Sequence, residues 1–331
     1  MLIFWGEIAE SDIVRSLREF MRQSASPAFN FFTSHPLFDV SHAGWHTDTM
    51  QPMNSPLLAA DILRHSQATA NGLEVEVVQN TGSTNADLRA SIAKLNAPKL
   101  LVAENQTAGR GRAGRSWLAE PGSSLCFSLA WKFQGDLSVL SGLSLAVGVS
   151  LAKTLRLEGW AIELKWPNDL LKDGLKLGGV LIESAADRAQ HNNDQQPAVW
   201  AILGVGLNTQ HSASLEANLE HKIAALSTKP IDRNLLCAKL IDGLVLSLQE
   251  FELHGLKNFI QPWQEYHAYA NQIVSIIEQG QILHEGIASG IDNNGCLLLQ
   301  SLQAPCHVTA IAVGDVSLRP VVTEKNHVAT H

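Results

Sequence analysis

Cysteine, basic charge and long apolar runs are all scarce in this sequence. The four cysteines, at positions 126, 237, 296 and 306, form no Cys-x-x-Cys pair and no zinc-binding spacing. We therefore expect free thiols in a reducing compartment rather than a disulfide framework. No apolar run reaches the roughly 18 to 20 residues that cross a bilayer, and the first residues lack the basic region of a secretory signal. These absences predict a cytoplasmic protein without a membrane partner.

The charge balance is acidic, with 24 lysines and arginines against 32 acidic residues and a formal net charge of −8. Such a chain is not expected to have a polyanion as its main partner, so any arginine cluster needs a local explanation. Hydrophobic residues make up 45% and charged residues 17%, as in folded globular proteins. The 331 residues suffice for one large domain and one or two small ones.

The N-terminal part differs from the rest. Residues 1–66 hold four arginines, no lysine and seven acidic residues, and no helix-turn-helix pair is legible there. Because a DNA-binding module needs basic residues to neutralise phosphates, we expect no DNA partner. We interpret residues 1–54 as an irregular extension. Met50 and Met53 closely precede the recognisable pattern, so we hypothesise that the native chain starts near them, which N-terminal sequencing tests.

From residue 55 onward, helical and strand patterns alternate without a regular strand–helix–strand rhythm. Asp173-Gly174, between two apolar runs, is a strong hairpin signal. The mixture predicts an α+β fold with a mixed or antiparallel sheet and helices. The expected helices are 57–64, 84–95, 140–155 and 236–251, and the expected strands are 73–79, 99–104, 125–131, 162–166, 170–172, 175–183 and 199–208.

The last third changes character after a helical stretch through Trp263. Five short strand patterns follow, separated by Gly- and Asn-containing turns. They predict a small C-terminal β-barrel. We expect a large domain over residues 55–268, the barrel over 269–320 and a loose tail over 321–331.

The most informative segment is Gly109-Arg-Gly-Arg-Ala-Gly-Arg115, followed by Ser116-Trp117. Its three glycines let backbone N–H groups converge on an anion, and its three arginines supply forked donors for phosphate and carboxylate. The alternative is a flexible RNA-binding Arg-Gly tract. A single copy between two apolar strands favours a loop that folds over a small anionic ligand.

Four further motifs are weak when taken alone. Lys165-Trp-Pro-Asn-Asp169 brings a lysine to a strand end, and Lys176-Leu-Gly-Gly-Val-Leu-Ile-Glu183 opens a glycine-thinned strand with another lysine. Gly82-Ser-Thr-Asn85 stands at a helix start, where free N–H groups suit an anion or a ureido-type group and where Thr84 is a candidate helix cap. Gly204-Val-Gly-Leu-Asn208 ends a strand. Each also has an ordinary structural explanation as a turn, cap or bulge.

The order of these motifs is specific, and together they make the chain resemble the biotin–protein ligase family over about residues 55–320. The resemblance implies a class II synthetase-like catalytic domain followed by a small SH3-like barrel, here ending in Gly314-Asp-Val-Ser-Leu-Arg319. It also implies two substrates, biotin and ATP, with Mg²⁺ bound mainly through ATP.

The resemblance assigns roles by position. Arg110, Arg112 and Lys176 are expected to be catalytic, and Trp117 to pack where the loop rejoins the sheet. No residue is an obvious general base for the acceptor lysine. The polar segment 209–224 is a candidate adenine-side loop. The biotin-binding residues implied are Ser83, Thr84, Asn85, Gln106, Arg110, Gly111, Arg112 and Lys176, and those for ATP or the adenylate are Arg115, Lys165, Asn168 and Asn208.

The implied activity is ATP-dependent formation of biotinyl-5′-AMP and transfer of biotin to a lysine of the biotin carboxyl carrier protein of acetyl-CoA carboxylase. A homodimer is left open. The first alternative is a lipoate or octanoyl ligase, against which the Gly-Arg-Gly-Arg loop and the terminal barrel speak. The second is a biotin-sensing transcriptional repressor, against which the acidic N-terminal part speaks.

Overall fold

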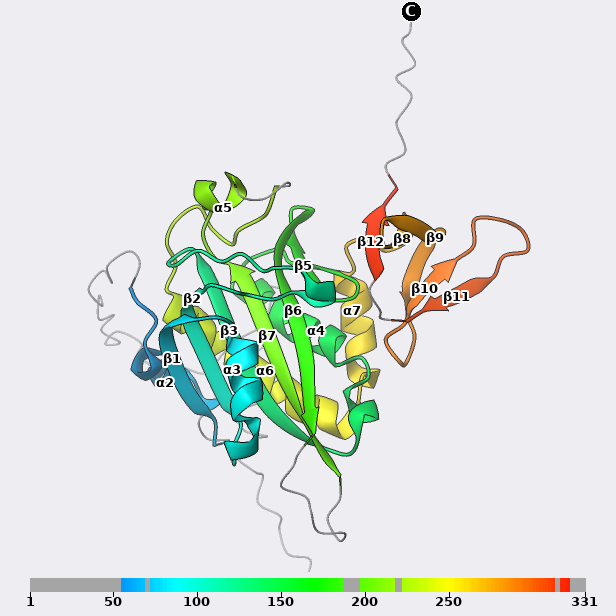
Figure 1. Cartoon of the computed structure of the whole chain (residues 1–331). Coiled ribbons are helices and arrows are strands. Elements are labelled where there is room, and N and C mark those ends of the chain that lie inside the picture. The colour runs from blue at the N-terminus through cyan, green and yellow to red at the C-terminus, as the bar shows by residue number, and fades with distance from the viewer. Residues whose placement is uncertain (1–54, 69–71, 187–196, 218–221, 313–315, 322–331) are drawn as a thin grey trace, which may run out of the picture. The chain divides into compact units, whose positions relative to one another are not determined.

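The computed structural model describes residues 55–68, 72–186, 197–217, 222–312 and 316–321; the predicted N-terminal extension and most of the predicted tail lie outside these ranges. The main element is a seven-stranded sheet in the order β1-β2-β3-β7-β6-β5-β4 (Figure 1). Only β1 and β2 are parallel, and the other neighbours are antiparallel. The predicted α+β class with a mixed sheet is confirmed. The strands are β1 (Glu74–Thr81), β2 (Lys99–Gln106), β3 (Ser124–Gln134), β4 (Glu163–Lys165), β5 (Asp169–Lys172), β6 (Leu175–Ala186) and β7 (Ala198–Asn208).

Two long helices, α4 (Leu143–Leu157) and α6 (Arg233–His254), pack together and bury their apolar sides against one face of this sheet. The core between them holds alternate β3 side chains such as Leu125, Phe127 and Leu129, because successive side chains of a strand point to opposite faces. The smaller cluster on the other face joins Leu88 of α3 (Thr84–Ser91) to Trp200. Figure 1 shows α3 in front of the sheet and α6 behind it.

Local chemistry explains where several elements begin and turn. Asp232 caps α6 by accepting hydrogen bonds from the backbone N–H groups of Asn234 and Leu235. Asp173 and Gly174 both adopt positive φ angles, 53° and 73°, as a type I′ turn requires, so the predicted hairpin is confirmed. The predicted cap at Thr84 is wrong: Ser83 occupies the N-cap position and makes no side-chain capping bond. The helix expected over 84–95 also changes at Ile92 into a 3₁₀ turn, η2 (Ile92–Lys94).

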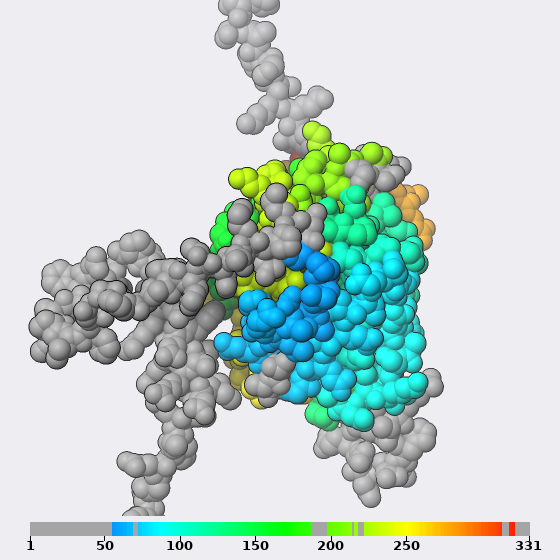
Figure 2. Space-filling view, turned by 90° about the vertical axis from the view of Figure 1, so that its left-hand side faces the viewer, coloured from blue at the N-terminus to red at the C-terminus, as the bar shows by residue number. Residues whose placement is uncertain are grey.

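Shorter helices complete the first sheet's surroundings. Helix α2 packs against α6, and η5 leads directly into α7. In the view of Figure 2, the described surface is mainly blue to cyan, which is the side of α2 and the edge strand β1. These elements are α2 (Ala59–His65), η3 (Arg112–Gly114), η4 (Leu137–Leu140), α5 (Ala213–Ala217), η5 (Lys257–Phe259) and α7 (Ile260–Tyr266).

One helical stretch among the described residues, Leu137–Leu157, is long and apolar enough to cross a membrane by length and composition alone. It comprises η4 and α4. Ten of the fifteen residues of α4 are buried within the protein, and α4 packs on α6. Its apolar character is therefore explained by its place in the core.

A second sheet follows α7, with five antiparallel strands in the order β11-β10-β9-β8-β12. It confirms the small C-terminal β domain expected from the spacing of strands and turns. Trp166, fully buried beyond the end of β4, donates its indole N–H to the carbonyl oxygen of Gly295 at 3.1 Å and thereby links the two sheets. The strands are β8 (Ile273–Glu278), β9 (Gln281–Ile291), β10 (Leu297–Gln300), β11 (Val308–Ile311) and β12 (Val316–Pro320).

Candidate active site

A cavity of about 620 Å³ opens where β6 and β7 meet the glycine- and arginine-rich loop. It is large enough for a small organic ligand together with a nucleotide. The structure brings all the predicted site residues into its wall, although their roles remain predictions. The predicted residues that line the cavity are Ser83, Thr84, Asn85, Gln106, Arg110, Gly111, Arg112, Arg115, Lys165, Asn168, Lys176 and Asn208.

The arginine loop is a closed hairpin-like turn over the cavity. Trp117 donates its backbone N–H to the Gly109 carbonyl at 2.9 Å, and Gly111 donates to the Arg115 carbonyl at 2.7 Å. Ala113 and Gly114 both have positive φ angles, 53° and 69°, which permits the tight reversal between Gly111 and Arg115. The loop is thus a folded structure and not an extended Arg-Gly tract.

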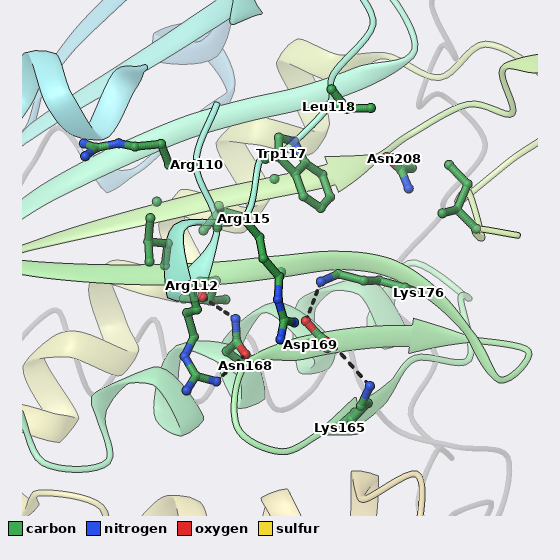
Figure 3. Close-up of a pocket in the computed structure, with 18 of the residues that line it drawn as sticks. Arg110, Arg112, Arg115, Trp117, Leu118, Lys165, Asn168, Asp169, Lys176 and Asn208 are labelled. Carbon is green, nitrogen blue, oxygen red and sulfur yellow. Dashed lines mark hydrogen bonds and ion pairs between the residues drawn. The ribbon is translucent and has the colours of Figure 1, made fainter. Parts of the chain in front are cut away.

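The three arginines of the loop diverge. Arg112 donates to the Asn168 side-chain oxygen at 3.1 Å, and Figure 3 shows Arg115 pointing from the loop toward the same side of the cavity. Arg110 instead reaches the carboxylate of Glu183 on β6, at 3.3 Å. Two guanidinium groups therefore face the interior, where phosphate or carboxylate would bind, while the third is tied to the sheet.

Two lysines converge on one carboxylate at the far side of the cavity. Lys176 lies 2.7 Å and Lys165 3.6 Å from the oxygens of Asp169 (Figure 3). Burial lowers the pKa of Lys165; the charge of Asp169 opposes that shift, and the charges of Arg319 and Lys176 reinforce it. The local excess of positive charge suits an anion carrying more than one negative charge.

The opposite end of the cavity is polar but carries less charge. Gln106 accepts the backbone N–H of Thr84 at 2.8 Å, which satisfies one of the free donors at the start of α3. This bond explains why α3 needs no capping side chain. Asn85 donates to Glu183 at 2.9 Å and accepts from Ser128 at 2.6 Å. The end nearest α3 therefore presents hydroxyl and amide groups to a ligand.

Glycines on β7 allow two side chains to lie flat against the sheet. A Cβ atom on Gly204 would come within 2.4 Å of the Asn85 side-chain oxygen, and one on Gly206 within 2.4 Å of the Trp117 indole. The Gly-Val-Gly motif is thus required by close approach rather than by a turn. Cys126 also lies in this region, where burial raises the pKa of its thiol to about 11, so it is protonated at neutral pH.

Asn208 ends β7 at the cavity. Its side-chain N–H₂ donates to the Ala224 carbonyl at 3.1 Å, and its side-chain oxygen is buried without a hydrogen-bond partner among the described residues. A buried acceptor of this kind is usually satisfied by a ligand or a water molecule. Leu215, Lys222 and Ile223, from the segment interpreted as an adenine-side loop, line the same region.

The cavity wall also holds residues that the sequence did not indicate as site residues, among them Asp169, Tyr269 and Arg319. Asp169 stood within a recognised motif, and its position between two lysines of different strands was the available signal. Tyr269 and Arg319 come from the junction with the second sheet and from β12. Nothing in the spacing of the sequence indicates that this sheet contributes to the cavity.

No dedicated metal centre is formed by the described residues, which contain no group of three or more His, Cys, Asp or Glu side chains arranged to hold an ion. Asp169 is the carboxylate of the cavity wall, and two lysines occupy its oxygens. This donor set does not fit a cation held by the protein alone.

Comparison with protein families finds a match over residues 75–195 to the family described as Biotin/lipoate A/B protein ligase family. The chain is 34% identical over 247 residues to the bifunctional ligase/repressor BirA of Salmonella typhimurium, covering 74% of each chain. It is 33% identical to the BirA protein of Escherichia coli, covering 70% of each. A biotin–[acetyl-CoA-carboxylase] ligase of Mycobacterium tuberculosis is 38% identical over 52% of this chain and 62% of its own length.

The solved structures give a consistent result. The biotin protein ligase of Aquifex aeolicus, determined in complex with biotin and ATP, superimposes with a TM-score of 0.61 at 25% identity. The match covers 75% of this chain and 99% of the Aquifex chain. The match supports the α+β fold with its mixed sheet.

Proposed function

The chain belongs to the biotin/lipoate A/B protein ligase family, among its biotin–protein ligases, and we propose from this that it activates biotin with ATP and transfers it to a lysine of a biotin carboxyl carrier protein. The acceptor domain we propose is that of acetyl-CoA carboxylase, in the cytoplasm. The family membership makes the chain an enzyme. The choice of substrates for this chain is our proposal, supported by the names of its relatives and by the chemistry of the cavity.

One observation carries the proposal: a single cavity has a polar, lightly charged end at Thr84 and Gln106 and a strongly basic end at Lys165 and Lys176. Biotin has a polar ureido ring at one end and a carboxylate at the other. With the ring near α3, its carboxylate would point toward the lysines, where the ATP phosphates would also lie. The two reacting groups would then meet beneath the arginine loop.

In the first step, a carboxylate oxygen of biotin attacks the α-phosphorus of ATP. A new P–O bond forms, the bond to the bridging oxygen breaks, and pyrophosphate leaves. Negative charge accumulates on the phosphoryl oxygens, and Arg112, Lys165 and Lys176 would stabilise it. A lysine about 4 Å from a phosphate contributes about 4 kcal/mol at an effective dielectric constant of about 20.

In the second step, the ε-amine of the carrier lysine attacks the acyl carbon of biotinyl-5′-AMP. The amide bond forms, AMP leaves with the electron pair of the C–O bond, and the amine loses a proton to solvent. The closed loop from Gly109 to Trp117 would keep water from the mixed anhydride until the carrier binds. No described side chain is assigned as the general base.

We propose that Mg²⁺ binds to the phosphates of ATP and not to a dedicated set of protein ligands. The described residues offer no three-carboxylate or His-containing cage, so we route no step through a protein-held ion. We propose that a divalent cation bound to ATP neutralises part of the phosphate charge. The lysines and arginines of the cavity would share that task.

The experiment that tests the proposal is biotin-dependent exchange of labelled pyrophosphate into ATP. The wild type is expected to exchange with biotin and not with lipoate or octanoate, whereas Arg112→Ala is expected to lose at least tenfold of the rate. The matched control is Arg89→Ala, because Arg89 pairs with Glu183 outside the cavity wall and is exposed. Exchange with lipoate alone would move the chain to the lipoate branch, and no exchange with either acid would refute adenylation.

The bifunctional names of the BirA proteins of Salmonella typhimurium and Escherichia coli raise the question of DNA binding. We propose a ligase without repressor function, because residues 1–66 carry four arginines and no lysine against seven acidic residues. A gel-shift assay with promoter DNA from the source genome, with and without biotin and ATP, would show no retained complex. A biotin-dependent complex would contradict this part of the proposal.

A further inference from the structure

Ser128 lies behind the polar end of the cavity and is not part of its wall. Its side chain is fully buried on β3. The hydroxyl oxygen lies 2.6 Å from the Thr84 hydroxyl and 2.6 Å from the Asn85 side-chain oxygen. Ser128 therefore joins the first two residues of α3, both of which face the cavity.

The orientation of the Asn85 amide is fixed from its other side. Its N–H₂ group donates to the Glu183 carboxylate at 2.9 Å and to the Leu181 carbonyl at 3.3 Å. Both partners are acceptors, so the amide cannot turn around without placing oxygen against oxygen. The Asn85 oxygen must face Ser128, and Ser128 must donate its proton to that oxygen.

This fixes the Thr84 hydroxyl in turn. The only hydroxyl proton of Ser128 is donated to Asn85. In the contact of 2.6 Å between the Ser128 and Thr84 hydroxyls, Thr84 must therefore be the donor. The competing arrangement, in which Thr84 donates to Gln106 at 3.2 Å, would leave two hydroxyl oxygens 2.6 Å apart with no hydrogen between them. The Thr84 oxygen therefore has only lone pairs left for the cavity.

At Thr84 and Gln106 a ligand consequently meets two acceptor oxygens. The Thr84 hydroxyl offers lone pairs, and the neighbouring Gln106 oxygen already accepts the Thr84 backbone N–H and has one further lone pair. Substrates with an N–H group can pair with them. An acid with a purely apolar tail would leave buried acceptors unsatisfied, which costs more than a missing hydrogen bond in water does.

We propose that Ser128 is a positioning residue that determines substrate specificity: through the chain Thr84–Ser128–Asn85–Glu183 it holds the Thr84 hydroxyl as a hydrogen-bond acceptor, and the site thereby selects acids that carry an N–H donor, as a cyclic urea does. This rests on the proposed function, since it concerns the acid that the ligase activates. It also explains discrimination against lipoate-type acids by a residue that no substrate touches.

The test is a double-mutant cycle on the equilibrium dissociation constant for labelled biotin. Ser128→Ala frees the Thr84 hydroxyl to rotate, and Thr84→Val removes it at nearly constant volume. Each is expected to raise the dissociation constant about tenfold, the value of one good hydrogen bond. The double variant is expected to match Thr84→Val within about twofold, because Glu183 and Leu181 still hold Asn85 and the loss of Ser128 then reaches the ligand through the Thr84 hydroxyl. Ser128→Thr, which keeps a donor, is expected to restore most of the affinity.

The Michaelis constant for ATP in pyrophosphate exchange separates positioning from general damage. It is expected to stay within about twofold in all four variants, because the basic end of the cavity is unchanged. Three results would each overturn the proposal while leaving the ligase assignment intact. The first is a double variant in which the two increases in the biotin dissociation constant multiply. The others are an unchanged biotin dissociation constant in Ser128→Ala and a Michaelis constant for ATP that rises as much as the biotin dissociation constant. Should Ser128→Ala fail to fold, Ser128→Cys, of similar size and a weak donor, replaces it in the cycle. A wild type that binds no biotin would overturn both this proposal and the proposed function.

Discussion

At the residue scale, the central feature of the candidate site is the carboxylate of Asp169 between two lysines. It lies 2.7 Å from the Lys176 ammonium and 3.6 Å from that of Lys165, and side-chain exposures are low for Asp169 and Lys165, at 16% and 12%. A carboxylate here weakens the net field felt by a phosphate. Its presence is therefore best explained by positioning, because it holds two flexible side chains in place before the substrates bind.

Asp169→Asn tests this positioning. The substitution keeps the shape of the side chain but removes the charge that holds the lysines, so we expect the rate constant of biotin-dependent pyrophosphate exchange to fall at least tenfold. The Michaelis constant for ATP should change less, since both lysines keep their charge. Asp173→Asn is the matched control, because Asp173 is exposed in the β5–β6 turn and pairs with Lys172. A rate unchanged in Asp169→Asn would mean that the phosphates themselves order the lysines.

Site residues differ in how clearly the sequence alone indicates them. The loop from Arg110 to Arg115 could be predicted because glycine and arginine alternate in a way that ordinary turns do not require. Ser128 could not, because a serine within an apolar strand carries no local signal, and its importance depends on two neighbours 43 and 44 residues away in the chain. The sequence also does not show where two segments approach closely. A glycine within a strand is usually destabilising, and the need for Gly206 becomes clear only because the Trp117 indole packs against it.

At the element scale, α7 shows how a buried polar group ties two parts of the fold together. His267 follows the helix directly, stacks on Trp263 with ring centroids 4.4 Å apart, and forms a bridge with Leu164 at β4. The residue is 7% exposed, and burial lowers the pKa of its imidazole from 6.5 to about 4. The folded protein therefore favours the neutral imidazole, whereas the unfolded chain binds a proton already below about pH 6.5.

The linkage predicts a direction for acid destabilisation. The stabilising effect of neutral His267 is fully present above pH 6.5 and is lost as the pH falls toward 4. For one proton at about 1.4 kcal/mol per pH unit, the free energy of unfolding should drop by about 2 kcal/mol between pH 7 and pH 5. Urea unfolding at both pH values measures it. His267→Phe should flatten the difference, and His284→Gln, at an exposed position of β9, should leave it unchanged. An equal drop in His267→Phe would assign the effect to other groups.

Elements were predicted well where a long run of residues is largely buried and less well at their ends. Strand β3 and helices α4 and α6 carry long apolar patterns, and the expected and observed spans overlap. The sequence signal at the start of α3 is misleading, because Thr84 resembles a capping residue, whereas Gln106, 22 residues away, supplies the acceptor. Tertiary hydrogen bonds of this kind replace local ones without changing the local sequence signal.

At the scale of the whole described structure, the cavity draws on both sheets. The sequence pattern of each sheet predicts that sheet. It does not predict that both sheets line one cavity, because the second sheet contributes through side chains at its junction with the first. Tyr269 and Arg319 line the cavity, and the charge of Arg319 acts on the pKa of Lys165 and of Tyr269. The guanidinium of Arg319 thus lies within electrostatic reach of the basic end, although β12 is far from β4 in sequence.

This arrangement predicts that the C-terminal sheet takes part in nucleotide binding. Arg319→Ala removes one of the positive charges around the proposed phosphate site, so we expect the Michaelis constant for ATP to rise about tenfold in pyrophosphate exchange, with the dissociation constant for biotin changed less than twofold. Arg319→Lys should recover part of the effect, because it restores charge without the forked geometry. Lys153→Ala, at an exposed position of α4, controls for loss of net charge. If Arg319→Ala weakened biotin and ATP binding equally, the second sheet would support the fold of the cavity rather than the nucleotide itself.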